Sequence, residues 1–192
     1  KAVDAQEAKT LLDGVNNGTY NSPKDKLLAL DAALKSASSD QVRTVASQQD
    51  AYRAIVHEAS AWAAQPYDGN IRFKDDGQFV KALQGADDSS SRYVSLLSGL
   101  SSPQMQADLI TEATPQLDKL AHFAINYHSE DRDLHAASTL SNLSSIVGTL
   151  GQQNPAAAQS LASEFAGQVN GRVWDGGTFG DCRDVAPEGV SQ

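Results

Sequence analysis

SSPQMQADLITEATPQLDKLAHFAINY, residues 101–127, carries the pattern that decides the fold class. Its apolar residues recur every three or four positions, as they do along one face of an α-helix. Two prolines each follow a hydroxyl residue, at Ser102-Pro103 and Thr114-Pro115. Proline suits the first turn of a helix, where its missing N–H would have no partner, and the side chain before it can cap that helix. The stretch therefore predicts either two helices that abut at Pro115 or one helix that is kinked there.

The same signals recur along the rest of the chain. Ser22-Pro23 and Asn154-Pro155 repeat the capped proline, and Ser47 begins a segment that is similar to a capping box. The period-two alternation that is typical of strands extends nowhere for long. We therefore predict an all-α fold, a compact irregular bundle of about eight helices. The helices are expected near 3–14, 23–37, 40–64 with a break near 47, 77–84, 89–99, 103–113, 115–127, 130–150 and 155–170.

The end of the chain departs from this pattern. Leu161, Phe165 and Val169 form the last apolar stripe at helical spacing, and the periodicity stops after residue 170. We therefore predict a helical bundle domain over 1–170 and an extended tail over 171–192, which is rich in Gly and Asp. The tail is expected to pack on the bundle or to lead to a further domain. Because the chain begins with Lys and not Met, it is expected to be a processed chain or a piece of a larger protein.

The charge of the chain narrows the range of partners. Lys and Arg number 15 against 24 Asp and Glu, which gives a net charge of −9 and a pI near 4.7. Such an acidic protein repels phosphate backbones and anionic lipid, so we expect neither nucleic acid nor a membrane as a partner. An acidic surface attracts basic molecules. The expected partner is therefore a protein that carries basic residues.

Candidate metal motifs are incomplete. His57 begins a segment that is similar to a zinc protease helix, but Ala61 stands where the second histidine ligand would be needed. His122, His128 and His135 are six and seven residues apart, with acidic residues between the last two. Those acids are typical of a solvated helix start, where they interact favourably with the helix dipole. We predict no metal site and no cofactor.

The segment VWDGGTFGDCRDV, residues 173–185, holds the single cysteine. A cysteine nucleophile needs a thiolate, which a nearby cation such as Arg183 favours, and usually a histidine base. Together with Asp184 the sequence reads Cys-Arg-Asp. This triplet resembles the Cys-x-Asp signature of the bacterial ubiquitin ligases of the IpaH and SspH class, helical proteins whose thiolate carries ubiquitin as a thioester. The resemblance implies a transferase with Cys182 and Asp184 as catalytic residues, and the alternative is a thiol that only packs.

Three longer segments, 49–69, 106–124 and 139–167, carry a second resemblance. Their amphipathic patterns resemble a helical region of large multidomain secreted or effector-like proteins of proteobacteria, and the likeness extends over about two thirds of the chain. It implies a bacterial module cut from a longer polypeptide, secreted or translocated, with a role in virulence. It implies no particular reaction.

Two functional hypotheses follow from these observations. The first is a non-catalytic helical module that binds another protein, because no catalytic motif is assembled in the sequence. Trp174 and Phe179 are its predicted binding residues, since aromatic side chains in the tail are available for contact. The second is the cysteine-dependent transferase that uses Cys182. A further aromatic corner, formed by Trp62, Pro66 and Tyr67, is expected to belong to the core, and the alternative is an interface.

Overall fold

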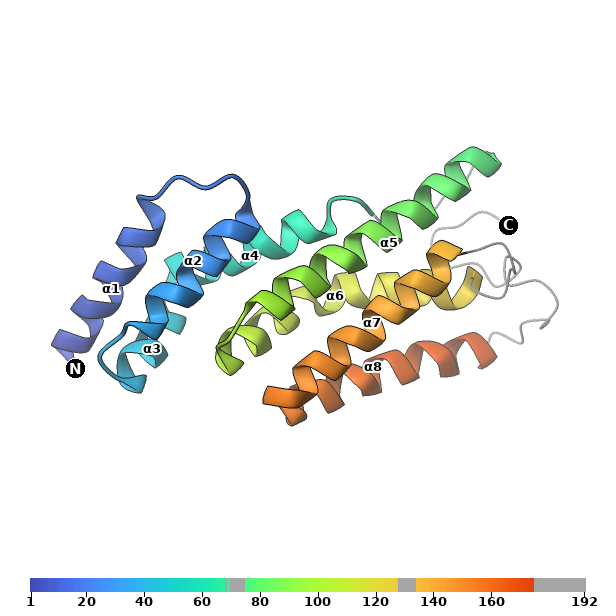
Figure 1. Ribbon diagram of the computed structural model, residues 1–192. Helices are drawn as coiled ribbons and strands as arrows, with labels where there is room; N and C mark the ends of the chain where they lie inside the picture. The colour runs from blue at the N-terminus through green and yellow to red at the C-terminus, as the bar shows by residue number, and fades with distance from the viewer. Residues whose placement is uncertain (68, 70–74, 128–133, 175–192) are drawn as a thin grey trace.

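The computed structural model describes residues 1–67, 69, 75–127 and 134–174. Within these ranges the chain forms a compact bundle of eight α-helices with no strand, which confirms the predicted all-α fold (Figure 1). The helices are α1 Ala2–Asn16, α2 Pro23–Lys35, α3 Asp40–Ser47, α4 Asp50–Ala64, α5 Asp76–Gly99, α6 Pro103–Tyr127, α7 Leu134–Gln153 and α8 Pro155–Trp174.

The helices fall into two sets along the molecule. Helices α1 to α4 pack on one another at the N-terminal end, and α5 to α8 pack at the other end (Figure 1). In the second set, α5 has its most extensive contact with α7, and α6 packs against both α7 and α8. Helix α4 also contacts α5 and α6. One continuous core therefore links the two sets.

Alanine and aromatic residues both contribute to this core. Buried alanines such as Ala59 and Ala113 lie where helices contact one another, and small side chains there let helix axes approach closely. Tyr67 is buried and packs against the ring of Phe123, with ring centroids 5.1 Å apart. Trp62 is partly buried and packs on this core. The prediction that Trp62 and Tyr67 belong to the core is confirmed.

Three of the four predicted proline starts are capped as expected. Ser22, Ser102 and Asn154 each accept a hydrogen bond from the backbone N–H three residues on, at 3.2, 3.3 and 3.4 Å. Of the two alternatives at Pro115, the separate start at Thr114 is wrong and a single helix is found, because α6 continues through Pro115 and the Thr114 hydroxyl donates to a backbone carbonyl one turn back. Buried apolar residues lie on both sides of this proline, so packing outweighs the lost backbone hydrogen bond.

Other boundaries also differ from the prediction. The two helices expected at 77–84 and 89–99 form the single helix α5. The break near residue 47 is confirmed, but α4 begins after Gln49 with no side-chain cap, so the capping box predicted at Ser47 is wrong. Helix α8 continues past 170 to Trp174, which therefore belongs to a helix and not to an extended tail. Residues 175–192 lie outside the described residues.

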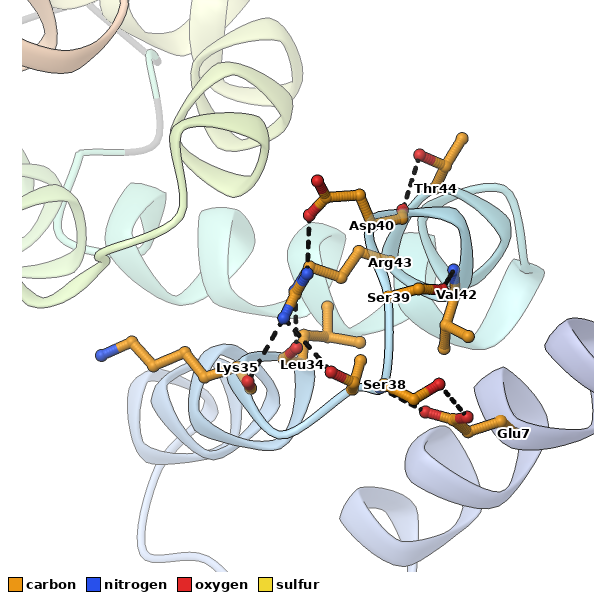
Figure 2. Close-up of polar contacts among 10 residues, drawn as sticks. Glu7, Leu34, Lys35, Ser38, Ser39, Asp40, Val42, Arg43 and Thr44 are labelled. Atoms are coloured by element: carbon orange, nitrogen blue, oxygen red, sulfur yellow. Dashed lines mark hydrogen bonds and ion pairs between the residues drawn. The ribbon is translucent and has the colours of Figure 1, made fainter.

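The turn between α2 and α3 shows how the N-terminal set is held together. Ser39 caps α3 by accepting a hydrogen bond from the backbone N–H of Val42 at 3.3 Å (Figure 2). The Arg43 guanidinium donates to the carbonyl oxygen of Leu34 at 2.9 Å, and also to the carbonyls of Lys35, at the end of α2, and Ala37, in the turn. It also pairs with Asp40 at 2.6 Å. One side chain therefore ties the end of α2 to the start of α3.

Helix α1 is tied to the same turn. The Glu7 carboxylate accepts hydrogen bonds from the backbone N–H of Ser38 at 2.7 Å and from its hydroxyl at 2.6 Å (Figure 2). These two bonds lower the pKa of Glu7, because they favour its ionised form. The contact fixes α1 against the α2–α3 turn.

Candidate functional site

A cleft of about 400 Å³, lined mostly by polar and charged residues, opens between α2, α3 and the start of α6. Asp31 is buried there and accepts hydrogen bonds from the backbone N–H groups of Ser101 and Ser102, both at 3.2 Å. The Tyr52 hydroxyl donates to Asp108 at 2.6 Å, and burial together with that carboxylate raises the pKa of Tyr52. These groups hold helix ends and neighbouring helices together. The cleft is therefore better explained as part of the scaffold than as a reaction site.

The described histidines lie at three different helix contacts. Each uses its Nδ1 atom to contact a carboxylate or amide oxygen on another helix. The pairs are His57 with Glu112 between α4 and α6, His122 with Gln168 at 3.0 Å between α6 and α8, and His135 with Asp87 at 2.9 Å between α7 and α5. Among the residues that the structure describes, no group of three or more His, Cys, Asp or Glu could hold a metal ion. His128 lies outside the described residues.

The contact between α5 and α7 contains a His, an Asp and a Ser, the residue types of a hydrolytic triad. In such a triad the serine hydroxyl is hydrogen-bonded to the histidine, which acts as its base. Here the Ser138 hydroxyl donates to Asp87 at 2.7 Å, and the Asn142 amide donates to the same carboxylate at 3.3 Å. The hydrogen bond of Ser138 therefore goes to the acid and not to His135. This network fastens α7 to α5.

An apolar groove of about 430 Å³ lies between α6, α7 and α8, and we call it the α6–α8 groove. Helices α7 and α8 diverge from the turn that joins them (Figure 1). Both helices contribute side chains to the groove, and α6 contributes two more. The lining residues are Ala121, Ile125, Leu140, Leu143, Ser144, Phe165, Ala166 and Val169.

The surroundings of the α6–α8 groove are poor in charge. In residues 134–174, which include all of α7 and α8, Glu164 and Arg172 are the only Asp, Glu, Lys or Arg residues. In the whole chain these four residue types make up 20%. The side chain of Val169 is 48% exposed at the edge of the groove. A contiguous apolar surface with few charges is typical of the centre of a protein–protein interface.

The residues predicted from the sequence as a site remain largely untested by the structure. Trp174 is the last residue of α8, and only its backbone is described. Phe179, Cys182 and Asp184 lie outside the described residues. The sequence pattern did not predict the groove. Phe165 and Val169 continue an apolar stripe at helical spacing, and such a stripe by itself predicts buried core positions. The scarcity of charged residues along 134–174 is the sequence signal that could have indicated an interface.

The chain matches no protein-family model, and it is similar to no curated protein or solved structure at a level that indicates a relationship. Within the described ranges, no helix combines the length and the hydropathy that a membrane-spanning segment needs.

Proposed function

We propose that this chain is a non-catalytic helical module that binds another protein, and that the α6–α8 groove is its docking surface. The observation that carries the proposal is the groove itself, about 430 Å³ in volume and lined by apolar side chains with one serine among them. Isolated exposed apolar residues are common on protein surfaces, but a contiguous apolar hollow more often marks an interaction site.

The occupant that fits best is an amphipathic helix of the partner protein. A groove between diverging helices accepts apolar residues spaced by three or four positions along a docked helix. Its docking face must be uncharged, because the groove offers no charged partner and burying an unpaired charge is costly. Its other face is expected to carry Lys or Arg, because the net charge of −9 favours approach of a basic partner.

A non-catalytic role is supported by three ionisable side chains that already form structural hydrogen bonds. Asp31, Asp87 and Arg43 each hold two helices or helix ends together. The transferase alternative depends on Cys182 and Asp184, outside the described residues, and it stays a prediction from sequence. A bacterial, secreted origin with a role in virulence likewise rests on the resemblance alone.

Two valines provide a matched test of the docking surface. Val169 lines the groove and is 48% exposed, whereas Val80 on α5 is 46% exposed and does not line the groove. The probe is a synthetic helical peptide with a leucine face and a lysine face, and the control is a peptide of the same composition with scrambled order. Binding to the wild-type chain, Val169→Gln and Val80→Gln is measured by calorimetry at low and high salt.

We expect the amphipathic peptide to bind the wild-type chain and Val80→Gln equally well, and Val169→Gln about tenfold more weakly. Such a loss corresponds to about 1.4 kcal/mol, the scale of a buried aliphatic contact. The scrambled peptide should bind weakly to all three, and added salt should weaken the specific complex. Equal binding by Val169→Gln and Val80→Gln, or equal binding of the two peptides, would refute the groove as the docking surface.

A further inference from the structure

The connection between α1 and α2 contains one of the two Asn-Gly pairs of the chain, Asn17-Gly18, and the other pair is Asn170-Gly171. Asn17 is the residue that follows α1, and it is exposed together with Gly18 and Thr19. Asn170 and Gly171 lie within α8, where the backbone is helical. The same dipeptide therefore occurs once at an exposed helix end and once inside a helix.

An asparagine that precedes a glycine can react with its own backbone. The backbone nitrogen of the glycine attacks the side-chain carbonyl carbon of the asparagine, a C–N bond forms, and ammonia leaves. Water then opens the cyclic succinimide and gives either aspartate or isoaspartate. Glycine favours this reaction because it has no Cβ atom to shield its nitrogen and because its backbone is conformationally permissive.

The packing of Tyr20 explains why a glycine stands at position 18. The Tyr20 ring is partly buried against the core, and its hydroxyl donates to the carbonyl oxygen of Val15, near the end of α1, at 2.8 Å. A Cβ atom on residue 18 would lie 2.7 Å from Cζ of this ring and still closer to the hydroxyl oxygen. A larger residue would therefore displace Tyr20 from its contact with α1. The fold requires the same glycine that makes Asn17 reactive.

Two backbone hydrogen bonds restrain this pair in the folded chain. The N–H of Asn17 donates to the carbonyl oxygen of Asp13 at 2.9 Å, and the N–H of Gly18 donates to that of Val15 at 3.1 Å. The second bond must open before the Gly18 nitrogen can reach the side chain of Asn17. Because this bond lies at an exposed helix end, its opening costs little free energy.

The products of the reaction would weaken the end of α1. Aspartate at position 17 places a negative charge at the C-terminal end of a helix, where the helix dipole disfavours it. It also stands four residues after Asp13, and like charges at this spacing repel each other on a helix surface. Isoaspartate adds a carbon atom to the main chain, which changes the position of the Gly18 N–H relative to Val15.

We propose that Asn17 is a site of spontaneous deamidation, which converts it with time to aspartate or isoaspartate and loosens the last turn of α1. Water is the only co-reactant that the reaction needs. The proposal goes beyond the docking function, because the α1–α2 connection belongs to the N-terminal set of helices and the α6–α8 groove lies in the other set (Figure 1).

Ageing of the whole chain in solution tests the proposal. The chain is kept at physiological temperature and sampled over days, and peptide mapping by mass spectrometry locates each deamidated residue. We expect Asn17 to react about tenfold faster than Asn21, which is also exposed but precedes Ser22. The reaction should be faster in mildly alkaline than in mildly acidic buffer, because the attacking nitrogen must lose its proton.

Two variants test whether the reaction loosens α1. Asn17→Gln keeps an amide on a longer side chain, which cyclises far less readily, and Asn17→Asp reproduces one product. Hydrogen exchange measures the protection of the amides in the last turn of α1. We expect this protection to fall severalfold in aged wild type and in Asn17→Asp, and to stay constant in aged Asn17→Gln.

The outcomes that contradict the proposal are distinct. If residue 17 is unchanged at the end of the incubation, or if Asn21 reacts as fast as Asn17, the modification site is refuted. Complete deamidation of Asn17 with unchanged protection of α1 would refute the loosening of that helix. None of these measurements uses a peptide, so the docking proposal is judged separately.

Discussion

The two ends of the bundle are built from different interactions. In α1 to α4, charged side chains join helices directly, as Glu7 does with Ser38 and Arg43 does with the end of α2. In α7 and α8, charge is almost absent and an apolar groove lies between the helices. Directional hydrogen bonds fix one geometry and are costly to break when buried, whereas apolar contacts are non-directional. We infer that the first end maintains the shape of the molecule and the second end is available to a partner.

The largest loss of stability expected from the change of a polar residue is at Asp31, which links the N-terminal set to the start of α6. Its buried carboxylate accepts bonds from Ser101 and Ser102, so Asp31→Ala leaves backbone donors without a partner. We expect the free energy of unfolding to fall by about 3 kcal/mol, measured by urea denaturation. Asp88→Ala, at an exposed position, should change it by less than about 0.5 kcal/mol. Equal effects of the two substitutions would contradict the distinction between structural and merely solvated acids.

A glycine at the junction of the two sets gives the next largest effect. A Cβ atom on Gly85 would lie 2.2 Å from the backbone oxygen of Pro66, which cannot move as a flexible side chain can. We expect Gly85→Ala to destabilise the chain by about 2 kcal/mol. Gly148, in α7, has nothing within 4 Å of the same position, so Gly148→Ala should stabilise the chain by about 0.5 kcal/mol or more. Thermal unfolding of both variants measures the contrast, and a neutral Gly85→Ala would show that this junction is not rigid.

The sequence predicts these helices well because their periodicity and caps are local signals. Ser22 and Asn154 could be identified as caps from their neighbours alone. The exceptions are positions where distant packing decides, such as Pro115, which α6 accommodates in its interior. The groove could not be predicted in this way, because whether Phe165 faces core or surface depends on how far α7 and α8 diverge. Only the depletion of charge around it was present in the sequence.

The free energy of unfolding of the whole chain is expected to depend on pH, and this effect is smaller than those of Asp31 and Gly85. Because burial raises the pKa of Asp118 to about 6, ionisation of this group weakens the folded state, and its contribution to stability should decline as the pH rises from about 4 to above 6. Asp118 is only partly buried, so solvent screening should limit this contribution to less than about 1 kcal/mol. Chemical denaturation of wild type and Asp118→Asn across this range measures it. A wild type that becomes more stable relative to Asp118→Asn as the pH rises would contradict the sign.

The smallest expected change in stability is also the one that best separates a binding surface from a core. Val169 is 48% exposed, so Val169→Gln should alter the free energy of unfolding by less than about 0.5 kcal/mol. Leu161, about two turns earlier on the same helix, is buried, and Leu161→Ala should cost about 2 to 4 kcal/mol. Both values come from urea denaturation at one pH. If Val169→Gln destabilised the chain as much as Leu161→Ala, the groove would have to be an incompletely packed part of the core, since a surface that serves only a partner contributes little to folding.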